Sequence, residues 1–133
     1  MFRTRALTVP VALLLLTGCA GVGDRSDAAA SVALRMLTAV QQDDGAAACG
    51  ALAPDTLAEL EQSAGQPCAE AILDEDLPQP GEVEQSQVYG QWAQVRLTGD
   101  TVFLGVFPGG WRVVAAGCTP RGDRPYDCEL QGS

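Results

Sequence analysis

VYGQWAQVRLTGDTVFLGVFPGGWRVVAA, residues 88–116, decides the expected fold because strand-like segments alternate in it with tight turn sequences. Valine, leucine and aromatic residues fill the segments, and Gly90-Gln91, Gly99-Asp100 and Pro108-Gly109-Gly110 separate them. Turns this short join neighbouring antiparallel strands. The pattern therefore predicts a four-stranded antiparallel meander, with strands at 83–89, 92–97, 101–107 and 111–116.

Helical periodicity precedes the meander. Apolar residues recur at spacings of three and four over 27–42, which is typical of an amphipathic helix. Pro54 and Pro67 suit the first turns of later helices, where a missing N–H costs little. We expect helices at 27–42, 46–52, 55–63 and 68–73. Helices followed by a meander predict an α+β domain, with N-terminal helices packed on one face of a curved four-stranded antiparallel sheet.

The N-terminus, MFRTRALTVPVALLLLTGCAG, has the pattern of an export signal. A basic start with Arg3 and Arg5 precedes an apolar run at 6–16, which is too short to span a bilayer. The motif LTGC, ending at Cys19, resembles the lipobox of bacterial lipoproteins. That resemblance implies cleavage before Cys19 and a diacylglyceryl group on its sulfur. An ordinary signal peptide with an incidental cysteine, or a core helix, is the alternative.

These features predict a division of the chain into three parts. Residues 1–18 are expected to be the signal peptide, residues 19–26 the lipidated cysteine and a short tether, and residues 27–133 a single α+β domain.

Four cysteines remain beyond Cys19, namely Cys49, Cys68, Cys118 and Cys128. An even number in an exported chain predicts two disulfides, for which three connectivities are open. Local pairing, Cys49 with Cys68 and Cys118 with Cys128, is the simplest. In that pairing Cys118 ends the last strand and Cys128 closes a loop back onto it.

Charge and composition limit the partners and the compartment. The chain after residue 18 has six arginines, no lysine and seventeen acidic residues, a formal charge of −11. Such a surface repels phosphate backbones, so we expect no nucleic-acid partner. The absence of Lys, Asn and His is typical of a high-GC bacterium, here a Gram-positive one. We expect the protein at the cell membrane, lipid-anchored on the extracytoplasmic side.

The chain has few of the side chains that commonly take part in catalysis. Without His or Lys, the chain has no Ser-His or Cys-His pair and no Schiff-base lysine. The cysteine spacings do not fit a zinc or thioredoxin-like site. Acidic residues in helices, turns and linkers are expected to be solvated: Asp43, Asp44, Asp74, Glu75, Asp76 and Asp100. We expect no metal site, no cofactor and no catalytic residue.

Aromatic residues are concentrated in or beside the predicted sheet. Tyr89, Phe103 and Trp111 could line a ligand pocket at the mouth of a curved sheet, although core filling is the commoner use of such residues. Arg121-Gly122-Asp123 spells an adhesion tripeptide, but a motif of three residues is more simply explained as a turn.

The order of elements resembles the nuclear-transport-factor-like, or cystatin-like, cone domain. The segment 88–130 is similar to the C-terminal half of small actinobacterial lipoproteins of that type, through its Gly-Trp strand start, Gly-Cys strand end and Pro-Tyr-Asp-Cys motif. The likeness covers about residues 26–130. It implies a cone fold whose members bind small hydrophobic ligands, isomerise or cyclise them, or mediate protein contacts.

We therefore expect a membrane-anchored binding or accessory module without catalytic activity. Its partner would be a neighbouring membrane protein or a small hydrophobic ligand. One alternative is an isomerase-like or cyclase-like enzyme with a buried carboxylate in the cone. Another is an interaction module that forms a homodimer through the open sheet face bearing Trp92 and Arg112.

Overall fold

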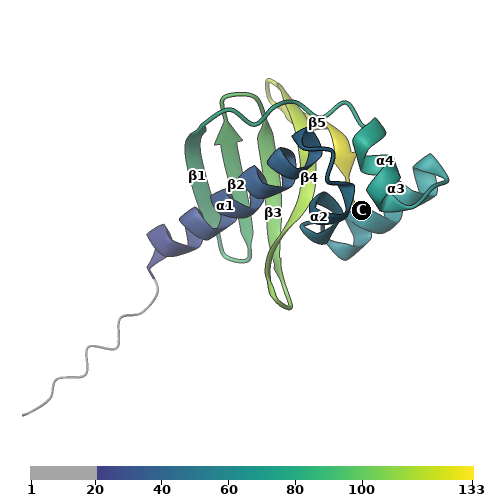
Figure 1. Cartoon of the computed structure of the whole chain (residues 1–133). Coiled ribbons are helices and arrows are strands. Elements are labelled where there is room, and N and C mark those ends of the chain that lie inside the picture. Colours follow the sequence, from purple (N-terminus) through teal and green to yellow (C-terminus); the bar gives the residue numbers. More distant parts are fainter. Residues whose placement is uncertain (1–20) are drawn as a thin grey trace, which may run out of the picture.

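The computed structural model describes residues 21–133, so the expected signal peptide and Cys19 lie outside the described residues (Figure 1). Four helices precede five strands, which confirms the α+β class with helices first. The helices are α1 (Val22–Gln41), α2 (Gly45–Gly50), α3 (Pro54–Ala64) and α4 (Cys68–Asp74). The strands are β1 (Val83–Tyr89), β2 (Trp92–Leu97), β3 (Thr101–Phe107), β4 (Gly110–Arg121) and β5 (Arg124–Gln131).

The sheet is an antiparallel meander in the order β1-β2-β3-β4-β5, one strand more than predicted. The expected loop after Cys118 is instead the end of β4, a tight turn at residues 122–123 and the strand β5. Cys118 pairs with Cys128 in the β4–β5 ladder, and an irregularity between Thr119 and Arg121 accommodates Pro120. The tripeptide 121–123 lies at this hairpin turn, where Gly122 has a φ of 67°.

α1 is longer at its N-terminus than the sequence predicts, because residues 22–26, expected as part of a tether, are already helical. Contacts with the sheet support these residues. Arg25 Nη2 donates to the Gly90 carbonyl at 2.7 Å, and the Ser86 hydroxyl donates to the Ser26 carbonyl at 2.7 Å. The spacing of apolar residues along the helix gives no information about these hydrogen bonds, because their partners lie 60 and 65 residues away in the chain.

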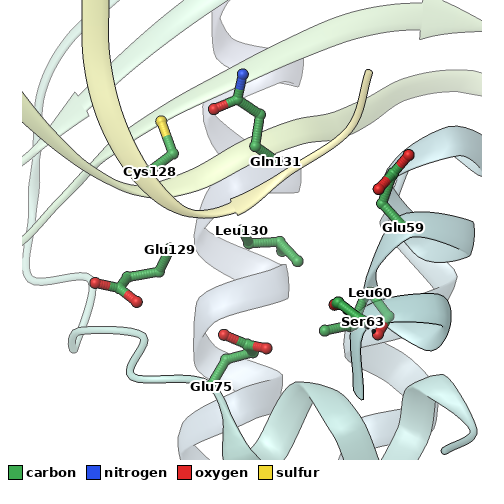
Figure 2. Close-up of a pocket in the computed structure, with 8 residues that line it drawn as sticks. All are labelled: Glu59, Leu60, Ser63, Glu75, Cys128, Glu129, Leu130 and Gln131. Atoms are coloured by element: carbon green, nitrogen blue, oxygen red, sulfur yellow. Dashed lines mark hydrogen bonds between the residues drawn. The ribbon is translucent and has the colours of Figure 1, made fainter. Parts of the chain in front are cut away.

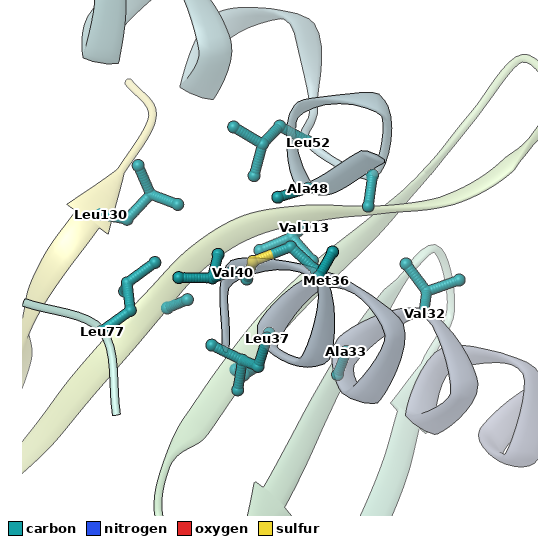
Figure 3. Close-up of a cluster of buried hydrophobic side chains, with 14 of the residues drawn as sticks. Val32, Ala33, Met36, Leu37, Val40, Ala48, Leu52, Leu77, Val113 and Leu130 are labelled. Carbon is teal, nitrogen blue, oxygen red and sulfur yellow. The ribbon is translucent and has the colours of Figure 1, made fainter. Parts of the chain in front are cut away.

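α1 crosses one face of the sheet, and α2, α3 and α4 form a corner beside β4 and β5 (Figure 1). The core lies between α1, this corner and the sheet, as Figure 3 shows for the side chains around Met36, Leu37 and Val113. Met36, Leu37, Val95, Leu104 and Val113 are fully buried. Alternation along β2 and β3 places one apolar row under the helices and leaves the opposite row open.

A bulge in the β3–β4 pairing joins the helical corner to the sheet. The register shifts between Phe103 and Leu104, and the backbone of Val113 turns to the α2–α3 linker. Val113 N–H donates to the Ala51 carbonyl, and Ala53 N–H donates to the Val113 carbonyl, both at 2.8 Å. The linker therefore has a fixed position beside β4.

Candidate functional site

The structure does not bring the three predicted pocket residues together. Tyr89 is paired with Trp92 on the open face of the sheet and is 58% exposed. Phe103 also lies on that face, where its ring meets the ring of Tyr126 edge-on at a centroid distance of 5.1 Å. Trp111 lies on the helix-covered face beneath Arg25. Strand alternation places Trp111 on the face opposite to Tyr89 and Phe103, and these two share the open face but lie in different cross-strand rows.

An apolar groove lies between the helical corner and the β3–β4 turn, and it has a volume of about 540 Å³. Its walls come from segments about fifty residues apart in the chain, which the Val113 backbone bonds hold together. The residues that line it are Cys49, Gly50, Leu52, Pro54, Leu57, Phe107, Pro108 and Arg112. Concave apolar surfaces with one or two polar groups are typical of small-molecule sites.

Arg112 is the only charged side chain among the residues that line this groove. Its Nη1 donates to the Gly50 carbonyl at the end of α2. A guanidinium has five N–H donors, so further donors remain for an acceptor atom in the groove. The register pairs Arg112 with Gly105 and Gly105 with Trp92, so Arg112 lies in the same row of the sheet as Trp92, and its guanidinium reaches from there to α2.

Sequence reasoning missed this groove. The signal that was available is weak: Leu52 is an apolar residue in the linker between α2 and α3, where polar residues are usual, and Pro54 begins α3. Nothing local in the sequence brings that linker beside Phe107 and Pro108.

An acidic recess of about 280 Å³ lies between α3 and β5. Figure 2 shows Glu59 on α3, Glu75 after α4 and Glu129 on β5 around it, together with Ser63 and Gln131. Burial raises the pKa of Glu75, and the nearby charges of Glu129 and Asp74 raise it further. Within residues 21–133, no three His, Cys, Asp or Glu side chains are grouped in a way that could hold a metal ion.

Asp100 is not the solvated turn residue that the sequence predicts, since only 8% of it is exposed. Its Oδ1 accepts the N–H groups of Thr101 and Cys118 at 2.7 and 2.9 Å, and its Oδ2 accepts that of Gly117 at 2.8 Å. Burial raises the pKa of Asp100, and these backbone N–H groups oppose that rise. The carboxylate clamps the β2–β3 turn to β4, which is a structural role.

Two disulfides join Cys49 to Cys68 and Cys118 to Cys128, which confirms the local pairing. The first links α2 to α4 and the second links β4 to β5. Disulfides of this kind persist in oxidising compartments outside the cytoplasm. The two bridges use four of the five cysteines of the chain.

None of the helices described in residues 21–133 has the length and apolar character needed to cross a membrane.

Comparisons with known proteins do not identify the chain: no family model matches it, and neither the curated proteins nor the solved structures contain a significant match.

Proposed function

We propose that this chain is an extracytoplasmic lipoprotein, anchored to the cell membrane through a diacylglyceryl group on Cys19, that acts as a non-catalytic binding module. The observation that carries this proposal is the pairing of Cys49, Cys68, Cys118 and Cys128, because it agrees with export and leaves Cys19, in the lipobox-like LTGC, as the remaining cysteine. A diacyl group provides two chains, which is enough for stable anchoring.

The apolar groove is the best candidate for the binding site, and a small hydrophobic ligand with an acidic group is the ligand class that it fits. Leu52, Leu57 and Phe107 supply apolar walls, and Arg112 supplies a cation at the edge. The proposed likeness to cone-type, cystatin-like domains agrees with this role, since many such domains bind small hydrophobic molecules. A neighbouring membrane protein remains the alternative partner.

The enzymatic alternative has little physical support. A carboxylate base needs an unoccupied oxygen facing a cavity. Asp100, the most buried acid among the described residues, has both oxygens engaged by backbone N–H groups and lines neither the groove nor the acidic recess. Glu75, whose pKa burial also raises, does line the acidic recess, but it is only partly buried, and no cationic side chain is among the lining residues to stabilise an anionic intermediate.

Intact mass of the protein extracted from membranes tests the anchor. We expect the mass of residues 19–133 with a diacylglyceryl addition, and a Cys19→Ala variant that lacks the addition and leaves the membrane fraction. A mature wild-type protein without lipid on Cys19 would contradict the anchor.

Binding of 1-anilinonaphthalene-8-sulfonate tests the groove, because this probe combines an apolar ring system with an anionic sulfonate. We expect saturable binding at one site and loss of that binding in Leu57→Glu. Val83→Glu, which changes an exposed apolar residue outside the groove, is the matched control. Equal binding by both variants would exclude the groove as the site.

A further inference from the structure

The exposed large apolar side chains are concentrated at one end of the molecule. Five such side chains occur in residues 21–133, and four of them lie at this end: Val22 (69% exposed), Tyr89 (58%), Trp92 (58%) and Val106 (40%). We call these four residues the aromatic end. The fifth, Val83, begins β1 and lies at the opposite end of that strand. Tyr89 and Trp92 lie on the open face and Val106, opposite Trp111, on the helix-covered face, so the exposed apolar side chains surround this end of the sheet. Exposed apolar side chains concentrated in this way usually mark a contact surface.

Three elements build the aromatic end. The β1–β2 turn and the β3–β4 turn lie side by side in the meander, where Val106 N–H donates to the Gln91 carbonyl at 3.0 Å. The first turn of α1 joins them through Arg25, which donates to the Gly90 carbonyl and places its guanidinium carbon 5.4 Å from the centre of the Trp111 ring. The start of α1 is therefore fixed to this end (Figure 1).

The position of Cys19 in the chain connects this end to the membrane. Cys19 stands three residues before Val22, the first residue of α1. A chain segment of that length spans at most about 11 Å when fully extended. The opposite end of the sheet lies roughly 20 Å away along the strands, because each residue of a strand adds about 3.3 Å. A lipid on Cys19 thus brings the aromatic end, and not the opposite end, to the bilayer surface.

We infer that the aromatic end docks on the lipid surface, with Tyr89 and Trp92 at the level of the headgroups. This inference rests on the proposed lipid anchor at Cys19. Tyr and Trp favour the membrane interface because they combine an apolar ring with a polar group that stays hydrated. The lipid supplies the affinity, and the aromatic end fixes the orientation of the domain.

The charges of the protein determine which lipid headgroups the aromatic end can approach. Asp24 and Asp27 are exposed on the first turns of α1, whereas Arg25 is engaged with Gly90 and Trp111. Arg112, beside the β3–β4 turn, donates to the Gly50 carbonyl, and the chain after residue 18 has a formal charge of −11. Anionic headgroups are therefore repelled, and the contact depends on ring insertion. We expect the aromatic end to lie closer to the surface of zwitterionic phosphatidylcholine vesicles than to the surface of vesicles that also contain phosphatidylglycerol.

Tryptophan fluorescence tests the orientation directly, because Trp92 and Trp111 are the only tryptophans of the chain. The processed lipoprotein is placed in phosphatidylcholine vesicles with plain or brominated acyl chains, and Trp111→Phe leaves Trp92 as the sole reporter. Bromines quench only rings close to them, so we expect about a twofold or greater loss of Trp92 emission for an interfacial ring. Tyr89→Ser should reduce that quenching.

A reporter at the opposite end provides the matched control. Arg124→Trp, in a chain that also carries Trp92→Phe and Trp111→Phe, places the sole tryptophan at the β4–β5 turn, where Arg124 is exposed. We expect no quenching there. Equal quenching at positions 92 and 124, or none at position 92, would overturn the inference.

Intact mass of the same sample separates this inference from the proposed function. If Cys19 carries no natural lipid, the anchor proposal fails, and Cys19 of the disulfide-bonded protein is coupled to a maleimide-headgroup lipid for the same measurement. Quenching at position 92 but not at 124 would then still support docking of the aromatic end. Its absence would reject docking independently of the anchor.

Discussion

The helical corner, α2 to α4, and the β4–β5 hairpin each contain one disulfide, but they differ in what else holds them. The corner helices have six, eleven and seven residues, and helices this short are marginal in water without tertiary support. The hairpin has a ladder of backbone pairs that runs from Ala115 with Gln131 to Arg121 with Arg124. A disulfide therefore supplies support that the short corner helices otherwise lack, whereas in the hairpin it links strands that the ladder already holds together.

Removing each disulfide in turn gives the largest expected effect. The Cys49–Cys68 loop has 20 residues and the Cys118–Cys128 loop has 11, so the chain-entropy model assigns each bond about 3 kcal/mol. We expect Cys49→Ala with Cys68→Ala to cost about 4 kcal/mol, since the corner also loses helix packing. The hairpin double variant should cost about 2 kcal/mol.

Urea unfolding of both double variants measures these values, with the wild-type protein as reference. Equal losses of stability would mean that the hairpin depends on its disulfide as much as the corner does, in spite of its ladder. A larger loss in the hairpin would reverse the comparison.

The two regions also differ in how well the sequence predicts them. The corner helices follow the predicted ranges within about two residues, because proline and apolar spacing are local signals. In the hairpin, Pro120 and Pro125 favoured a loop, yet the alternation of Tyr126, Cys128 and Leu130 was a strand signal that was available.

The features that sequence reasoning missed depend on partners far away in the chain. Asp100 is buried because it accepts N–H groups 17 and 18 residues further on, and α1 starts early because Arg25 binds a carbonyl 65 residues away. The groove likewise joins the α2–α3 linker to the β3–β4 turn. Local pattern and turn chemistry contain no information about these pairs.

Gly45→Ala tests whether close packing supports the corner in addition to its disulfide. A Cβ at Gly45 would lie 1.9 Å from the Ala69 carbonyl oxygen, so α2 and α4 would have to separate. We expect a loss of about 3 kcal/mol, typical of severe overpacking. Gly50→Ala in the same helix meets no atom within 4 Å and should be neutral or slightly stabilising. Equal unfolding midpoints for the two variants in urea would contradict this account.

Asp100→Ala tests the clamp that supports the sheet beside the hairpin. The substitution leaves the backbone N–H groups of Thr101, Gly117 and Cys118 without their acceptor, and we expect a loss of about 2 kcal/mol. Asp100→Asn should lose about half of that, because one oxygen remains. Asp123→Ala, at the exposed hairpin turn, is the control in the same urea measurement. A neutral Asp100→Ala would show that the clamp is dispensable.

Glu75→Gln gives the smallest expected effect and probes the contact between the two regions, since Glu75 follows α4 and faces Glu129 on β5. Burial and the charges of Glu129 and Asp74 raise the pKa of Glu75 in the folded protein above its unfolded value. The folded state then binds the proton more tightly, so stability falls as the pH rises from the unfolded pKa through the folded pKa. At neutral pH the ionised carboxylate destabilises the fold, and Glu75→Gln should add less than about 1 kcal/mol because the group is partly solvated.

Unfolding in urea at pH 4 and pH 7 should show this gain in stability at pH 7 and a smaller one at pH 4. Glu59→Gln, in the same recess, controls for the loss of one negative charge. Equal gains for both variants at pH 7 would mean that general charge repulsion, and not the site of Glu75, accounts for the effect.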